Sequence, residues 1–200
     1  MMTTQEEAQD IMGRNYFGIR QGVQYFHVNP TQDIVDALRE VPFSRETLED
    51  CKDTHVLVAI FPLSILDING MIEQRIFVIR ECPWYIKEDF AKDRGETGWC
   101  LVRKTPVPGS TSKEWDEQLA LLGENEEIPS AQIMVYTIVG HYFAEGERLF
   151  KDVCVLTSSD DSNGDPIGVD NFEDRLAVQV WGRGGHSDHV GVASVRKPDL

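Results

Sequence analysis

Residues 151–181 read KDVCVLTSSDDSNGDPIGVDNFEDRLAVQVW, and they carry the clearest structural pattern in the chain. Three runs rich in β-branched residues, 151–159, 166–172 and 175–181, are separated by clusters of Asp, Asn, Gly and Pro, which favour turns. A further run, HVGVASVR at 189–196, follows a glycine-rich loop. The sequence therefore predicts an antiparallel meander at this end of the chain.

Apolar and polar residues alternate along these predicted strands, and successive side chains of a strand point to opposite faces of its sheet. The residues expected to face the core are Ile167, Val169, Leu176, Val178, Val190 and Val192. The residues expected to face outward are Gly168, Asp170, Ala177, Gln179 and the loop GRGGHSDH at 182–189. The alternation thus predicts one buried face and one free face.

Two helices are predicted upstream of the meander. Thr111 and Glu114 have the spacing of a capping box, which predicts a helix over 111–122. Ser130 can cap a second helix over 131–146, AQIMVYTIVGHYFAEG, which ends at a glycine.

The first half of the chain mixes helical and strand patterns. Helices are predicted at 32–41, after Thr31, and at 45–52, after Ser44. Strands are predicted at 55–61, 75–80 and 98–103, which are short and rich in Val, Ile and Leu. Helices followed by a run of strands indicate the α+β class.

The composition excludes several classes of protein. With 19 Lys and Arg against 34 Asp and Glu, the net charge is −15, so we expect no nucleic-acid partner. The longest apolar run, at 56–66, contains Pro and Ser and is too short to span a membrane. No apolar leader is present, so we expect a cytoplasmic protein.

We expect a single domain over 1–200, with residues 1–15 either flexible or a short docking helix.

Candidate metal ligands occur in two places. Asp161, Asn163 and Asp165 have a spacing that calcium ligands use, but a turn stabilised by Asx side chains explains the same pattern and is favoured. His186 and His189 would need a third ligand from elsewhere. No cofactor or metal is therefore predicted.

The nucleophilic residues show no pattern typical of catalysis. The four cysteines, Cys51, Cys82, Cys100 and Cys154, lie far apart, which favours buried free thiols over zinc ligands or disulfides. No Ser, Cys or His stands in a spacing that places a nucleophile beside a base. The residues alone thus predict no enzyme.

Long side chains are unevenly distributed along the chain. Glu, Gln, Lys, Met and Trp account for 38 of the 156 residues from Met1 to Leu156 but only 3 of the 39 from Thr157 to Val195. Turns favour small polar residues in any protein, but this preference does not explain the arginines, histidines and valines at outward positions.

Residues 126–150 and 155–198 together resemble the end of C-type-lectin-fold proteins, in particular the variable proteins of diversity-generating retroelements. Pro129-Ser130 is similar to the Leu-Pro-Thr helix entry of formylglycine-generating-enzyme-like domains, and residues 191–196 are similar to their closing strand. The resemblance covers 98–198, about half of the chain.

The resemblance implies a non-enzymatic protein that binds a protein or glycan ligand through residues 157–195. In that family, codon changes at template adenines do not produce Glu, Gln, Lys, Met or Trp, which fits the uneven distribution. The ligand-binding residues implied are Asp161, Asn163, Pro166, Gly168, Asp170, Asp174, Ala177, Gln179, Gly182, Arg183, His186, Ser187 and His189. Trp181 would be a scaffold residue beside them, since an indole can lock a loop.

Two alternatives remain open. The formylglycine-generating-type oxidases are similar in their closing strand, but Cys154 stands alone after Cys100 here. A subunit of a homo-oligomer or larger assembly would require a large apolar interface, whereas this segment is polar and glycine-rich.

Overall fold

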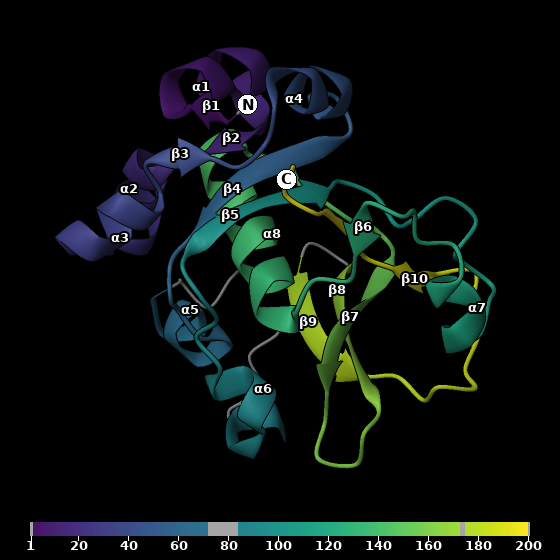
Figure 1. Cartoon of the computed structure of the whole chain (residues 1–200). Helices are drawn as coiled ribbons and strands as arrows, with labels where there is room; N and C mark the ends of the chain where they lie inside the picture. The colour runs from purple at the N-terminus through teal and green to yellow at the C-terminus, as the bar shows by residue number, and fades with distance from the viewer. Residues whose placement is uncertain (1, 72–83, 173–174, 200) are drawn as a thin grey trace.

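The computed structural model describes residues 2–71, 84–172 and 175–199 and has an α+β architecture (Figure 1). The predicted strand at 75–80, Cys82 and Asp174 lie outside the described residues. Two sheets meet around one central helix, and a third, two-stranded sheet lies at the N-terminal end.

The larger sheet has five strands in the order β2-β4-β5-β11-β6. Their bounds are Tyr16–Phe17, His55–Ile60, Gly98–Arg103, Val195–Arg196 and Glu126–Glu127. Among the described residues, the β2–β4 pair is parallel and the other three pairs of this sheet are antiparallel. The structure therefore confirms the predicted strands β4 and β5.

The second sheet has four strands in the order β10-β7-β8-β9. Their bounds are Val190–Val192, Cys154–Asp160, Pro166–Phe172 and Arg175–Val180. The antiparallel meander of β7, β8 and β9 is confirmed.

The prediction that the closing run extends this meander is wrong. β10 pairs with β7 in parallel, and β11 pairs with β5 in the five-stranded sheet. The chain crosses between the sheets at Ala193 and Ser194: the Ala193 amide donates to the Leu156 carbonyl, and the Ser194 carbonyl accepts from the Arg103 amide. The two sheets are thus joined by main-chain hydrogen bonds at this point.

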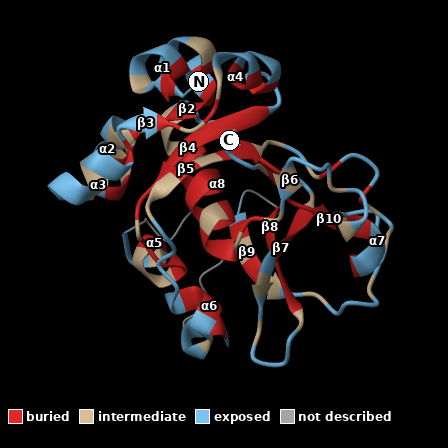
Figure 2. Ribbon diagram, viewed as in Figure 1, coloured by how far each residue is buried: buried red, intermediate tan, exposed pale blue. Residues whose placement is uncertain are grey.

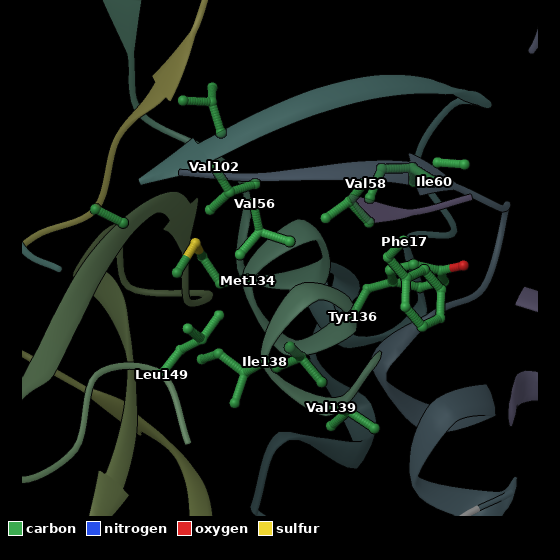
Figure 3. Packing of buried hydrophobic residues seen from close by; sticks show 14 of the residues in the cluster. Phe17, Val56, Val58, Ile60, Val102, Met134, Tyr136, Ile138, Val139 and Leu149 are labelled. Carbon is green, nitrogen blue, oxygen red and sulfur yellow. The ribbon is translucent and has the colours of Figure 1, made fainter. Parts of the chain in front are cut away.

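Helix α8, Ala131–Glu145, packs against both sheets. Its predicted caps are confirmed: the Ser130 hydroxyl accepts from the Ile133 amide at 3.2 Å, and Gly146 adopts φ +68°. In Figure 3, Val56 and Val58 of β4 lie over Met134 and Tyr136 of the helix. Because most of its residues are buried, α8 is the centre of the hydrophobic core.

Two helices cover the opposite face of the five-stranded sheet near the N-terminus, α1 (Gln5–Met12) and α4 (Arg45–Cys51) (Figure 1). Thr4 caps α1, and Ser44 caps α4 as predicted. Residues 5–12 are therefore helical, which is the second of the two alternatives for the start of the chain.

The remaining elements of the first half of the chain are short. They are β1 (Thr3–Thr4), the 3₁₀ turn η1 (Gly13–Asn15), α2 (Ile19–Phe26), α3 (Gln32–Ala37), β3 (Glu40–Val41), α5 (Ile65–Met71), the 3₁₀ turn η2 (Trp84–Lys87) and α6 (Asp89–Lys92). The predicted helix at 32–41 ends early, at Ala37, because residues 40–41 pair with β1.

The helix predicted over 111–122 is α7, Trp115–Leu119, and its predicted cap is wrong. Ser112 adopts φ +60°, and its amide donates to the Ser187 carbonyl, so the helix cannot begin at Thr111. The Glu117 carboxylate instead accepts from the Glu114 amide at 3.1 Å.

Within the described residues, no helix has both the length and the apolar character needed to cross a bilayer.

Candidate functional site

The four-stranded sheet is covered on both faces. On one face, Val155, Ile167, Val169, Leu176 and Val178 belong to the main core around α8. On the other, a second cluster consists of Val107, Trp115, Cys154, Leu156, Val190 and Val192. All six residues predicted to face inward are buried, but Val190 and Val192 belong to the second cluster.

The prediction that Gly168 and Asp170 face outward to solvent is wrong. Both are buried, with Asp170 at 6% exposed, because the second cluster lies over their face of the sheet. A Cβ atom on Gly168 would lie 2.5 Å from the Cys154 Sγ atom. Strand alternation separated the two faces correctly, but the second face is not free.

The neighbouring strand positions are also poorly accessible. Pro166 is buried, and Ala177 and Gln179 are half-buried. The Gln179 side-chain amide donates to the Asp170 carboxylate at 2.6 Å, so the two polar side chains pair with each other. These strand residues contribute structure rather than an open surface.

The turn between β7 and β8 is built by Asp161. One oxygen of its carboxylate accepts from the amides of Asn163 and Asp165 at 2.8 and 3.0 Å, and the other accepts from the Asn163 side chain at 3.0 Å. These hydrogen bonds, chiefly the one from the Asp165 amide, hold the pKa of Asp161 below its usual value. This geometry is the Asx turn that the sequence favoured over a calcium loop.

The loop from Trp181 to His189 is held by its own main chain and by one indole. The Trp181 Nε1 donates to the Gly185 carbonyl at 3.2 Å, and the Gly185 amide donates to the Gly182 carbonyl at 2.8 Å. The half-buried Ser187 accepts from the His189 amide through its hydroxyl. Trp181 therefore locks this loop.

Arg183 ties the loop to the β7–β8 turn. Its guanidinium donates twice to the Gly164 carbonyl, at 2.9 and 3.0 Å, and once to the Asp160 carboxylate at 3.2 Å. It also lies over the Trp115 ring, 5.8 Å from the ring centroid. Arg183 thus connects three segments that lie far apart in the sequence.

The exposed members of the predicted site lie in the turn between β7 and β8 and in the loop after β9, and both segments are drawn mostly in the exposed colour in Figure 2. Asn163, Gly182, Arg183, His186 and His189 are exposed. We refer to the β7–β8 turn, residues 160–165, and the loop at 181–189 together as the loop surface.

Sequence reasoning missed several contributors to this surface. The carboxylate of Glu88 accepts from the Ser162 amide at 2.8 Å and from its hydroxyl at 3.2 Å, which fixes the turn against the start of α6. The Trp115 amide donates to the Arg183 carbonyl. No short-range pattern marks contacts between residues so distant in the chain.

Two cysteine thiols, one in each of the larger sheets, have raised pKa values. Burial raises the pKa of Cys154 to about 12 and that of Cys100 also to about 12, so both stay protonated near neutral pH. Cys51, Cys100 and Cys154 are free.

Across residues 2–71, 84–172 and 175–199, no group of three or more His, Cys, Asp or Glu side chains could hold a metal ion.

Comparisons with protein-family models, with curated proteins and with solved structures found no match for this chain.

Proposed function

We propose that this protein is a non-enzymatic binding protein of C-type-lectin type that contacts a protein or glycan ligand through the loop surface. The observation that carries the proposal is the way this surface is held. Its exposed side chains at Asn163, His186 and His189 project from a backbone fixed by Asp161, Trp181 and Arg183 and by main-chain hydrogen bonds. A surface that changes its partner by changing side chains needs a backbone that does not depend on them.

The course of the chain supports the lectin-type fold. In the segment 98–198, which carries the resemblance, the first strand, β5, pairs antiparallel with the last, β11. α7, α8 and the β7–β9 meander lie between them in the expected order. The proposed contact residues exclude the strand positions Gly168 and Asp170, because both are buried.

The proposal predicts that the loop surface tolerates substitution whereas the strand face does not. In a displayed library, positions 163, 182, 186 and 189 are randomised together and selected for binding to lysozyme, a defined probe protein. A matched control library randomises 168, 170, 177 and 179.

Most members of the loop library should fold, with melting temperatures close to that of the parent chain, and selection should enrich lysozyme binders. Members of the control library should mostly fail to fold. General unfolding of the loop library, or a folded loop library that yields no binder, would overturn the proposal.

A further inference from the structure

A small polar cavity is lined by residues of α1, β2 and the first turn of α2. Figure 1 shows these three elements at the N-terminal end of the molecule, away from the loop surface. The volume of the cavity is about 220 Å³. The residues that line it are Gln5, Glu6, Gln9, Tyr16, Ile19, Arg20 and Gln21. All but Ile19 carry hydrogen-bonding side chains, a composition that suits a polar ligand.

Two of these side chains are held in place by the backbone. The Gln5 side-chain amide donates to the Leu38 carbonyl at 2.7 Å, which leaves its oxygen as an acceptor. The side-chain oxygen of Gln21 accepts from the Gly18 amide at 3.1 Å, which leaves its NH₂ group as a donor. Each of these two side chains therefore keeps one hydrogen-bonding group that its backbone partner does not use.

Tyr16 adds a second donor in a fixed position. Its side chain is 6% exposed and packs so closely on Gly18 that a Cβ atom there would lie 2.5 Å from the phenol oxygen. Burial raises the pKa of Tyr16 to about 12, with the charge of Arg20 acting in the opposite direction, so the phenol keeps its proton. Within the described part of the chain, this hydroxyl makes no hydrogen bond.

Opposite charges line the same cavity without pairing. Glu6 and Arg20 are both exposed and both line it, yet no ion pair joins them or binds either to another described residue. A ligand that carries both charges would satisfy both groups, whereas a neutral or singly charged ligand would leave at least one of them unpaired.

We propose that this cavity binds a small zwitterion of the α-amino-acid class. The ligand carboxylate is received by the Arg20 guanidinium and the hydroxyl of Tyr16, and its ammonium group by the Glu6 carboxylate and the side-chain oxygen of Gln5. This site is independent of the loop surface, and neither proposal requires the other.

The test is a titration of the ¹⁵N-labelled full chain with L-alanine, followed by the amide resonances of Gly18 and Gln21. Propionate and ethylamine each carry only one of the two charges, and glucose carries neither. L-alanine should move both resonances saturably, and the other three compounds should bind at least about tenfold more weakly, because a charge-assisted hydrogen bond is lost.

Arg20→Gln and Glu6→Gln should each weaken L-alanine binding about tenfold or more by the same argument. Arg39→Gln and Asp33→Asn, exposed charge changes outside the cavity, should not weaken it. The dispersion of the same spectra verifies that each variant is folded. The proposal is overturned if L-alanine moves neither resonance, if propionate or glucose binds as tightly as L-alanine, or if the Arg20 and Glu6 variants bind normally.

Discussion

The strands and the loops of residues 154–190 were expected to form one surface, but they behave differently. Gly168 and Asp170 on β8 lie beneath the second hydrophobic cluster, whereas Asn163 and His186 on the loops are exposed. Gly and Asp occur in both regions, so residue type alone does not separate them. A strand face with small or polar side chains is accessible only where no other element covers it.

The largest effect is expected on the covered face. Gly168→Val would place a branched side chain against the Cys154 Sγ atom and the Leu156 side chain, so we expect a loss of about 3 kcal/mol in the free energy of unfolding. Urea denaturation measures it. Gly182→Ala is the control, because a Cβ atom there meets nothing within 4 Å, and it should cost about 0.5 kcal/mol or less. Equal effects of the two substitutions would remove the distinction between strand face and loop.

Buried and exposed histidines extend the comparison to pH. Burial, assisted by the nearby Arg103 guanidinium, lowers the pKa of His55 to about 4, well below the usual value for histidine of about 6.5. The folded state therefore favours neutral His55. Its contribution to stability is complete above about pH 6.5 and is lost as the pH falls toward 4, up to about 3 kcal/mol.

His55→Gln should consequently reduce the loss in the free energy of unfolding between pH 7 and 4, which urea denaturation measures. The exposed His186→Gln should leave that loss unchanged. If the His55 variant loses as much stability between pH 7 and 4 as the parent chain, His55 does not cause the pH dependence.

A smaller effect is expected where the loop surface is tied together. Arg183→Ala removes the hydrogen bonds to Gly164 and Asp160, and we expect a loss of about 1 kcal/mol because these groups are exposed to water. Amide exchange should accelerate at 160–165 and 181–189 but not in α8. Arg45→Ala, which removes an exposed ion pair with Glu49 on α4, is the control. Unchanged exchange in the loops would show that Arg183 does not hold them.

The smallest effect is expected from the exposed side chains themselves. Asn163→Ala and His186→Ala should each change the free energy of unfolding by about 0.5 kcal/mol or less, since neither side chain supports the core. Thermal melting of the single and double variants checks this. A double variant that melts far below the parent would place these residues in the framework instead.

Predictions from neighbouring residues were accurate where no distant segment pairs with the same backbone. Ser130 and Gly146 delimit α8, and residues 98–103 form β5, because a cap or an apolar strand is decided within a few positions. Thr111 failed as a cap because the amide of Ser112 bonds to the distant Ser187. Similarly, residues 40–41 were predicted to be helical but form β3, which pairs with β1.

The candidate site was only partly predictable for the same reason. The Asx turn at Asp161 and the locking role of Trp181 depend on residues two to four positions away. Glu88 and Trp115 reach the loop surface from segments more than sixty residues distant, and the sequence contains no sign of these contacts.

The α+β class, the meander and the side chains that share a strand face can be read from the amino-acid sequence, because strand alternation is a local property of the chain. The coverage of the second face by α7 and residues near Val107, and the pairing of β11 with the other sheet, follow from the folded structure alone. Coverage depends on which apolar surfaces meet when the chain compacts, so it could be established only from contacts between segments that are remote in sequence.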